Sequence, residues 1–219
     1  MSTASKLKDW LIILFSMIII GLSAWWMLRS GGFDLTLPSD SKLAWHLTRS
    51  AGIVSYLLLL ASTIWGLFLS NQWIKNWSPG PVSMTLHSTV SWLAVLLGLT
   101  HGLLLMFDGY YTYTLSDIFV PFTGPYRPEF VGLGTLAFWM LLLVAVSFWV
   151  KKWVGFKIWK RLHYISYVAF LMVTLHGMFA GTDGEHLGFR LLVSIGLALT
   201  MTLLVARIFK SQGRRELAR

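Results

Sequence analysis

Cysteine is absent from this chain of 219 residues, and charged residues are scarce. The lack of cysteine excludes disulfides, zinc–thiolate sites, iron–sulfur clusters and thioether-linked c-type haem. Only 12% of the residues are charged and 56% are hydrophobic, and no polar stretch is long enough to form a separate soluble domain. This composition is too apolar for a soluble protein of this length and indicates a membrane protein.

Nucleotide-binding motifs are also missing. The sequence contains neither a glycine-rich fingerprint between a strand and a helix nor a phosphate-binding P-loop. We therefore expect no flavin or NAD(P)H domain, and we interpret residues 1–219 as a single transmembrane domain.

Six apolar runs are long enough to cross a bilayer, whose core of about 30 Å requires roughly 20 helical residues. The first run follows two lysines, but it is longer than the apolar region of a typical signal peptide and has no small-residue cleavage site, so we interpret it as a retained span. The sequence thus predicts an all-α integral membrane protein with six transmembrane helices. They cover about residues 10–28, 44–69, 82–107, 131–150, 162–180 and 189–209.

Basic residues predict the orientation of these spans. The segment between the fourth and fifth spans has five basic residues and no acid, and the C-terminal tail is also basic. Positive residues favour the cytoplasmic side, so both termini are expected there. The net charge of +9 is therefore a topology signal, with some attraction to anionic lipid, and not a sign of nucleic-acid binding.

Four histidines lie inside the apolar runs in two pairs of similar spacing. His87 and His101 are fourteen residues apart in the third run, and His163 and His176 are thirteen residues apart in the fifth. An ionisable ring in a span is costly and marks a functional site by default, and imidazole is a common axial ligand of haem iron. Both runs are expected to cross from inside to outside, which puts His87 and His163 at the inner depth and His101 and His176 at the outer depth. The pattern predicts two haems between the third and fifth helices, with one such pair binding each iron.

The helical geometry of the two runs differs. Each pair spans roughly 20 Å along its helix, but fourteen residues keep a common face whereas thirteen do not. A kink, a bulge or different rotamers must therefore turn His163 and His176 to the same side. Two histidines per iron leave no open coordination position, which favours electron transfer over oxygen binding. The alternative is that the histidines are polar packing residues or proton sites.

Other residues near these depths have two interpretations each. Arg49 either binds a haem propionate or snorkels to the interface, and Arg161 with Lys160 either reaches the inner propionates or only sets the topology. Phe170 lies midway between His163 and His176 and either fills the gap between two macrocycles or packs in the core. Gly98, Gly102 and Gly177 allow close approach of a macrocycle or of another helix. The roles of His46 and His186 stay open, with interfacial packing favoured for the first and a solvated loop position for the second.

Several of these elements resemble the ferric reductase-like transmembrane domain family, which includes the membrane part of NADPH oxidases and ferric reductases and the haem-binding membrane subunit of the periplasmic methionine-sulfoxide reductase system. The resemblance covers about residues 45–209. It rests on the histidine pairs, the sequence RSAG at residues 49–52, PFTGPYRP at residues 121–128 and WKRLH at residues 159–163.

The resemblance implies a six-helix bundle that holds two b-type haems and carries electrons from a cytoplasmic flavin to an external acceptor. Without a flavin domain, the donor must be a separate flavoprotein, free reduced flavin or a membrane quinol. Oxidase members have an additional histidine one turn after the outer ligand of the third span, where this chain has Leu105. Dedicated superoxide production is therefore not expected. A bacterial inner membrane is the expected location.

Competing functions remain at this stage. The leading hypothesis is a transmembrane electron conduit that acts as a reductase component on ferric complexes. The alternative is a haem-binding subunit that delivers electrons to a periplasmic oxidoreductase, with the outer segment of residues 108–129 as the docking face. A quinol-linked cytochrome b and a haemless transporter or proton channel fit the sequence less well. Whether the chain alone is an enzyme stays open.

Overall fold

The computed structural model describes residues 41–74 and 78–216, together with residues 18, 22 and 25. The chain divides into two compact units, Met1–Asp40 and Ser41–Arg219. The predicted first span, residues 10–28, lies outside the described residues except for three isolated positions. The fold described below is that of the second unit.

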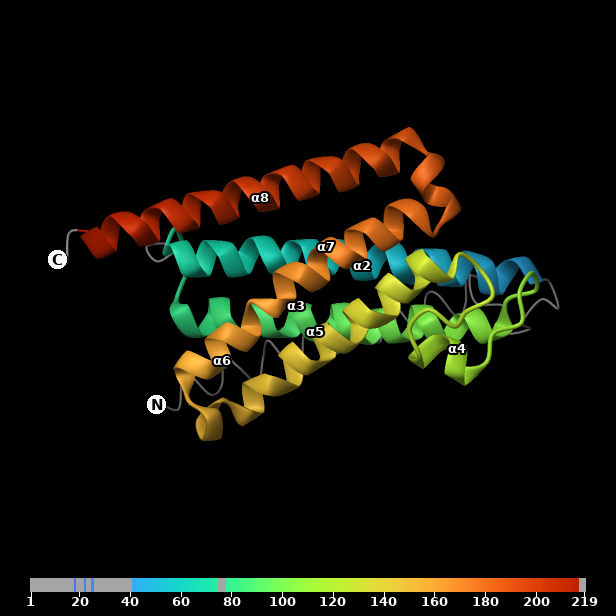
Figure 1. Ribbon diagram of the computed structural model, residues 1–219, viewed down its shortest axis with the longest axis horizontal. Coiled ribbons are helices and arrows are strands. Elements are labelled where there is room, and N and C mark those ends of the chain that lie inside the picture. The colour runs from blue at the N-terminus through green and yellow to red at the C-terminus, as the bar shows by residue number, and fades with distance from the viewer. Residues whose placement is uncertain (1–17, 19–21, 23–24, 26–40, 75–77, 217–219) are drawn as a thin grey trace. The chain divides into compact units, whose positions relative to one another are not determined.

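The second unit is helical, with no strand among its described residues. Long apolar runs without internal proline explain why each helix extends over many turns, since a backbone in lipid must satisfy its own hydrogen bonds. The elements, in chain order, are α2 (Ser41–Asn71), α3 (Gly80–Leu104), the 3₁₀ turn η1 (Leu105–Phe107), α4 (Leu115–Phe119), α5 (Pro128–Val154), α6 (Phe156–His163), α7 (Ile165–Phe179), the 3₁₀ turn η2 (Thr182–Glu185) and α8 (Leu187–Glu216) (Figure 1).

Five helical segments of the described chain are long and apolar enough to span a membrane, so the protein is a multi-pass membrane protein. They agree with the second to sixth predicted spans, with ends that differ by a few residues. The largest difference is at the start of the fifth span, where α6 joins α7 in one span and only a turn at Gly155 separates it from α5. The five segments are Leu43–Asn71, Gly80–Phe107, Pro128–Val154, Phe156–Phe179 and Leu187–Lys210.

Local backbone chemistry sets the ends of α5. Pro128 occupies the first turn, where its missing N–H costs nothing. Arg127 precedes it in the left-handed region (φ 38°), and its guanidinium donates a hydrogen bond to the Phe179 carbonyl at 2.7 Å. Gly155 ends the helix with φ 82°, which a residue with a side chain rarely adopts. The start of α5 is thereby tied to the end of α7.

Neighbouring helices build the bundle: α2 is antiparallel to α3 and α5 to α7, whereas α8 runs parallel to α2. In Figure 1, α2 and α3 run side by side, α5 lies alongside α7, and α8 covers α2. The α8 contact is close, because a side chain on Gly196 would meet Leu60 at 2.8 Å. A core cluster at mid-depth contains Tyr56, Leu59, Ala94, Phe170 and Val193.

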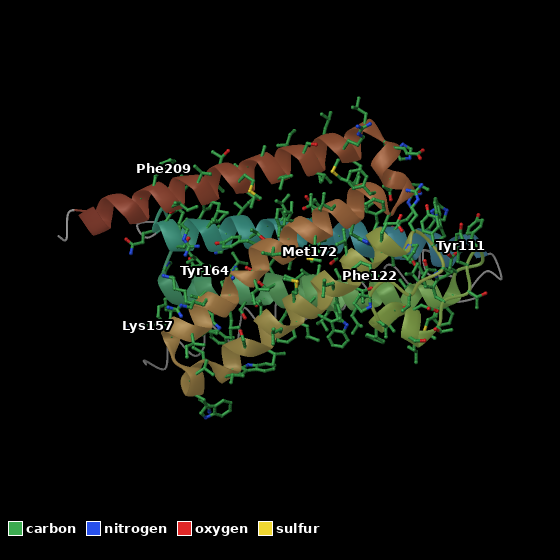
Figure 2. The ribbon with its side chains drawn as sticks, viewed as in Figure 1. Tyr111, Phe122, Lys157, Tyr164, Met172 and Phe209 are labelled. Atoms are coloured by element: carbon green, nitrogen blue, oxygen red, sulfur yellow. The ribbon has the colours of Figure 1, made fainter. Side chains whose placement is uncertain are left out.

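The second unit has two distinct ends, which we call the α4 end and the α6 end. Figure 2 shows Tyr111 and Phe122 at the α4 end and Lys157 and Tyr164 at the α6 end. The α6 end contains the basic residues of α6. Charge therefore favours the α6 end as the cytoplasmic one.

Candidate functional site

The histidines meet in the two pairs that the spacing predicts. His87 of α3 faces His163 of α6, with ring centroids 6.1 Å apart and an interplanar angle of 68°. His101 of α3 faces His176 of α7, with centroids 6.0 Å apart and an angle of 81°. We call them the α6-end pair and the α4-end pair. Two spans thus present two sets of facing imidazoles at two depths.

A break between α6 and α7 lies within the thirteen-residue spacing of His163 and His176. Tyr164 lies between the two helices, immediately after His163. Its N–H donates to the Arg161 carbonyl, and its own carbonyl accepts from the Tyr167 N–H, each at 3.2 Å. Both bonds join residues three apart, and such 3₁₀ geometry turns the chain by about 120° per residue instead of about 100°. The extra turn reduces the angular offset between His163 and His176.

Backbone carbonyls hold three of the four rings by the Nδ1 atom. His101 Nδ1 lies 2.8 Å from the Thr48 carbonyl, and His176 Nδ1 lies 2.9 Å from the Phe130 carbonyl. His87 Nδ1 lies 3.1 Å from the Ser62 carbonyl. A carbonyl only accepts, so each Nδ1 must donate its proton, which leaves the Nε2 lone pair free. This is the arrangement of metal-binding histidines.

A glycine lies four residues after each of these carbonyls, and its missing side chain leaves the space that the histidine ring occupies. A Cβ on Gly52 would lie 2.8 Å from His101 Nδ1, one on Gly66 would lie 3.0 Å from His87 Cε1, and one on Gly134 would lie 2.7 Å from His176 Nδ1. Real Cβ atoms almost never come closer than 3.0 Å to a neighbour. We call each carbonyl-plus-glycine unit a ring seat. The sequence reasoning missed these glycines.

The register of the ring seats carries a signal that could have revealed them. Gly52 and Gly66 are fourteen residues apart on α2, as His87 and His101 are on the antiparallel α3. On α5, a small buried residue, Ser147, follows Gly134 by thirteen residues, which is the spacing of His163 and His176. The neighbour of His163 differs from the glycines beside the other three rings. The Trp159 ring stacks on it, with centroids 5.2 Å apart and an interplanar angle of 30°.

A cavity of about 210 Å³ lies at the α4-end pair. His101 and His176 both line it, and most of its other lining residues are glycines and apolar side chains. Gly98, Gly102 and Gly177 are among them. A side chain on Gly98 or Gly102 would already be tight, at 3.3 Å from Ser55 or Ile118. These glycines therefore serve both the cavity and helix packing, and the two interpretations from the sequence do not exclude each other.

Arg49 binds a carboxylate of the protein itself. Its guanidinium forms two hydrogen bonds with Asp183 of η2, one of them 2.9 Å from Nε to Oδ2, and it lies 4.1 Å above the Trp45 ring. Arg49 and Asp183 both line the cavity. The pair joins α2 to η2 beside the α4-end pair. The propionate role of Arg49 stays a prediction, and Asp183 is the partner that the sequence reasoning did not foresee.

Phe170 is fully buried at mid-depth, between the two histidine pairs along its span. Its ring stacks on Tyr56, with centroids 6.1 Å apart and an interplanar angle of 16°. Core packing of Phe170 is therefore established, and its position between two macrocycles stays a prediction.

The remaining candidates lie farther out. Arg161 and Lys160 are exposed on α6, and His186 is exposed after η2. His46 is exposed on α2, where its ring packs edge-on against Trp45 at 4.8 Å. The structure does not bring these four residues into contact with the paired histidines.

The geometry of the pairs suits an iron between two imidazoles. Metal–nitrogen bonds of about 2 Å, with about 1.1 Å from each nitrogen to the ring centre, require centroids about 6.2 Å apart, close to the observed 6.0 and 6.1 Å. No cluster of three or more metal-ligating side chains occurs among the described residues. A porphyrin supplies four ligands itself, so two histidines suffice. The residues present fit haem.

Comparison with known families identifies the class of protein. Residues 51–174 match the family described as ferric reductase like transmembrane component. The match covers more than half of the chain, so the protein belongs to this family. It includes His87, His101, His163 and the three ring-seat glycines, and it ends two residues before His176. No curated protein and no solved structure matches the chain.

Proposed function

We propose that the protein carries electrons across a membrane through two b-type haems, bound non-covalently and each held by two histidines. The α6-end pair, His87 and His163, binds one haem iron, and the α4-end pair, His101 and His176, binds the other. The observation that carries the proposal is the spacing of the facing rings, 6.1 and 6.0 Å. The ring seats support it, because they direct three Nε2 atoms away from the carbonyls that bind Nδ1.

Bound haem would supply a one-electron couple at its iron. The chain orients the ligand rings, raises their basicity and excludes water. The Ser62, Thr48 and Phe130 carbonyls orient the ligand rings and raise their basicity. The buried stack of Phe170 on Tyr56 keeps water out of the region between the pairs. Two histidines on each iron would leave no coordination position for oxygen, which favours electron transfer over oxygen chemistry.

The direction follows from the charge distribution. We assign the basic α6 end to the cytoplasm of a bacterial inner membrane, where a separate flavoprotein, free reduced flavin or a quinol donates electrons. The α4 end then faces the acceptor, which is a ferric complex in the leading form of the proposal.

Haem quantitation tests the proposal directly. A pyridine haemochrome assay with protein quantitation should give two haems b per chain. His→Ala substitution at His87, His101, His163 or His176 should remove at least one haem. His46→Ala and His186→Ala are matched controls that should retain two, because both rings are exposed and away from the pairs. One haem per wild-type chain, or full haem content after loss of a paired histidine, would overturn the proposal.

A second candidate function differs only in the acceptor. The α4 end exposes large aromatic side chains, among them Tyr110, Tyr111 and Phe122, which is a composition typical of protein interfaces. This favours a subunit that delivers electrons to a periplasmic oxidoreductase. Reduced, purified protein mixed with ferric citrate separates the two. Fast reoxidation supports the reductase form, and reoxidation only after addition of a periplasmic extract supports the second.

A further inference from the structure

Arg207 of α8 is a cation inside a membrane-spanning segment, and it donates hydrogen bonds to two neutral hydroxyl groups. Its guanidinium donates to the Tyr167 hydroxyl at 2.7 Å and to the Tyr164 hydroxyl at 3.3 Å. Within the described part of the chain, the one ion pair is that of Arg49 with Asp183. Arg207 thus has no carboxylate partner there. An arginine in a span normally pairs with an anion, because an uncompensated charge is costly to keep away from water.

The position of Arg207 is next to the α6-end pair. Its guanidinium contacts two residues of the span that carries His163. Its two tyrosine partners follow His163 by one and four residues. The half-buried guanidinium consequently lies beside the first turn after His163, on the side of α8.

Two buried hydrogen-bond donors lack a partner toward the α6 end of the described residues. The indole N–H of Trp159, whose ring stacks on His163, is buried without a partner. The side-chain amide nitrogen of Asn71 is also buried and unpaired, while its backbone carbonyl accepts from Lys210 at 2.7 Å. Buried donors are normally satisfied, so the unpaired indole N–H beside His163 indicates a missing acceptor. The acceptor must be anionic, since Arg207 needs charge as well.

We propose that Arg207 is the principal binding residue for the carboxylates of the group held by the α6-end pair, with the Trp159 indole N–H as an additional donor. This rests on the proposed function and assigns the propionates of that haem to α8. A guanidinium fork matches a carboxylate in shape and charge. Arg161 and Lys160, the candidates from the sequence, are exposed on α6 and lack this enclosure.

Potentiometry and haem transfer test the assignment on the purified full-length protein. In Arg207→Gln, the midpoint potential of one haem should fall and that of the other should stay, because removal of a positive charge favours the oxidised iron. One of the two haems should also pass to apomyoglobin about tenfold faster. Arg161→Gln is the matched control and should behave like wild type in both measurements.

A second substitution can still test the role of Arg207 if the Arg207→Gln protein does not fold and bind haem. Arg207→Lys retains the charge but loses the fork, so its potentials should match wild type while one haem still transfers faster. The assignment would be overturned if Arg207→Gln left both the potentials and the transfer rates unchanged. It would also be overturned if only Arg207→Lys assembled and its haem transfer rate matched wild type. The expected effects in Arg161→Gln would overturn it as well. Wild-type protein with fewer than two haems would instead overturn the proposed function, so the two failures are distinguishable.

Discussion

Gly134→Ala should disturb the α4-end pair although Gly134 binds nothing itself. The added methyl carbon would lie 2.7 Å from His176 Nδ1 and 2.9 Å from both Cε1 and Cγ. Ordinary contacts between such atoms are about 3.5 Å, so the ring or the helix must move by about 0.8 Å. Overpacking of this kind costs roughly 1–3 kcal/mol, and the better helix propensity of alanine returns at most about 1 kcal/mol.

Neither direction of movement preserves a haem site. If the His176 ring moves toward His101, the centroid distance falls from 6.0 Å to about 5.2 Å, too short for an iron between two nitrogens. If α5 moves away instead, the hydrogen bond from Nδ1 to the Phe130 carbonyl lengthens from 2.9 Å to about 3.7 Å and is lost. We therefore expect about one haem per chain in place of two.

The assay is haem per chain by pyridine haemochrome, together with the electron paramagnetic resonance spectrum of the oxidised protein. Gly188→Ala on α8 is the control, because a side chain there meets nothing within 4 Å. Two haems per chain in Gly134→Ala, with the wild-type low-spin spectrum, would refute the ring-seat argument.

Three further predictions concern stability and ionisation. Asp183→Asn should weaken the link from η2 to Arg49 and destabilise the protein by about 1 kcal/mol, as measured by unfolding in detergent, and no further loss should occur when Arg49→Gln is added. Phe170→Ala should cost about 3–5 kcal/mol in the same assay, because the side chain is fully buried, and a loss below about 1 kcal/mol would contradict the core role. Burial, helped by the charge of Asp108, raises the pKa of Tyr113 to about 12, so a 295 nm titration of wild type minus Tyr113→Phe should show a step there. Stability should fall between pH of about 10 and about 12, because the unfolded chain releases this proton first, and a step near 10 would be inconsistent with the buried phenol.

The spans and the pairing of the histidines were predictable from the sequence, because both depend on periodicity along single helices. Apolar length defines a span, and depth alone matched His87 with His163 and His101 with His176. The thirteen-residue spacing required a kink, a bulge or different rotamers, but the break at Tyr164 depends on hydrogen bonds that no pattern specifies.

Specific contacts between helices could not be predicted from the sequence. Arg49 needed an anion, but nothing in the pattern shows that η2 brings Asp183 to it across 134 residues. The ring seats were missed for the same reason, since a glycine in a span has many ordinary packing roles. Only the equal spacing of Gly52 and Gly66 with His87 and His101 hinted at their function.

The ring seats lie on α2 and α5, which carry none of the paired histidines. A two-helix peptide built from α3 and the α6–α7 span would retain all four imidazoles and lose the carbonyls that fix three of them. Its rings would rotate freely about χ2 and present either nitrogen to a metal. The smallest transplantable unit of this protein is therefore four spans, Leu43–Asn71 through Phe156–Phe179, and a minimal synthetic cytochrome copied from it should begin with these.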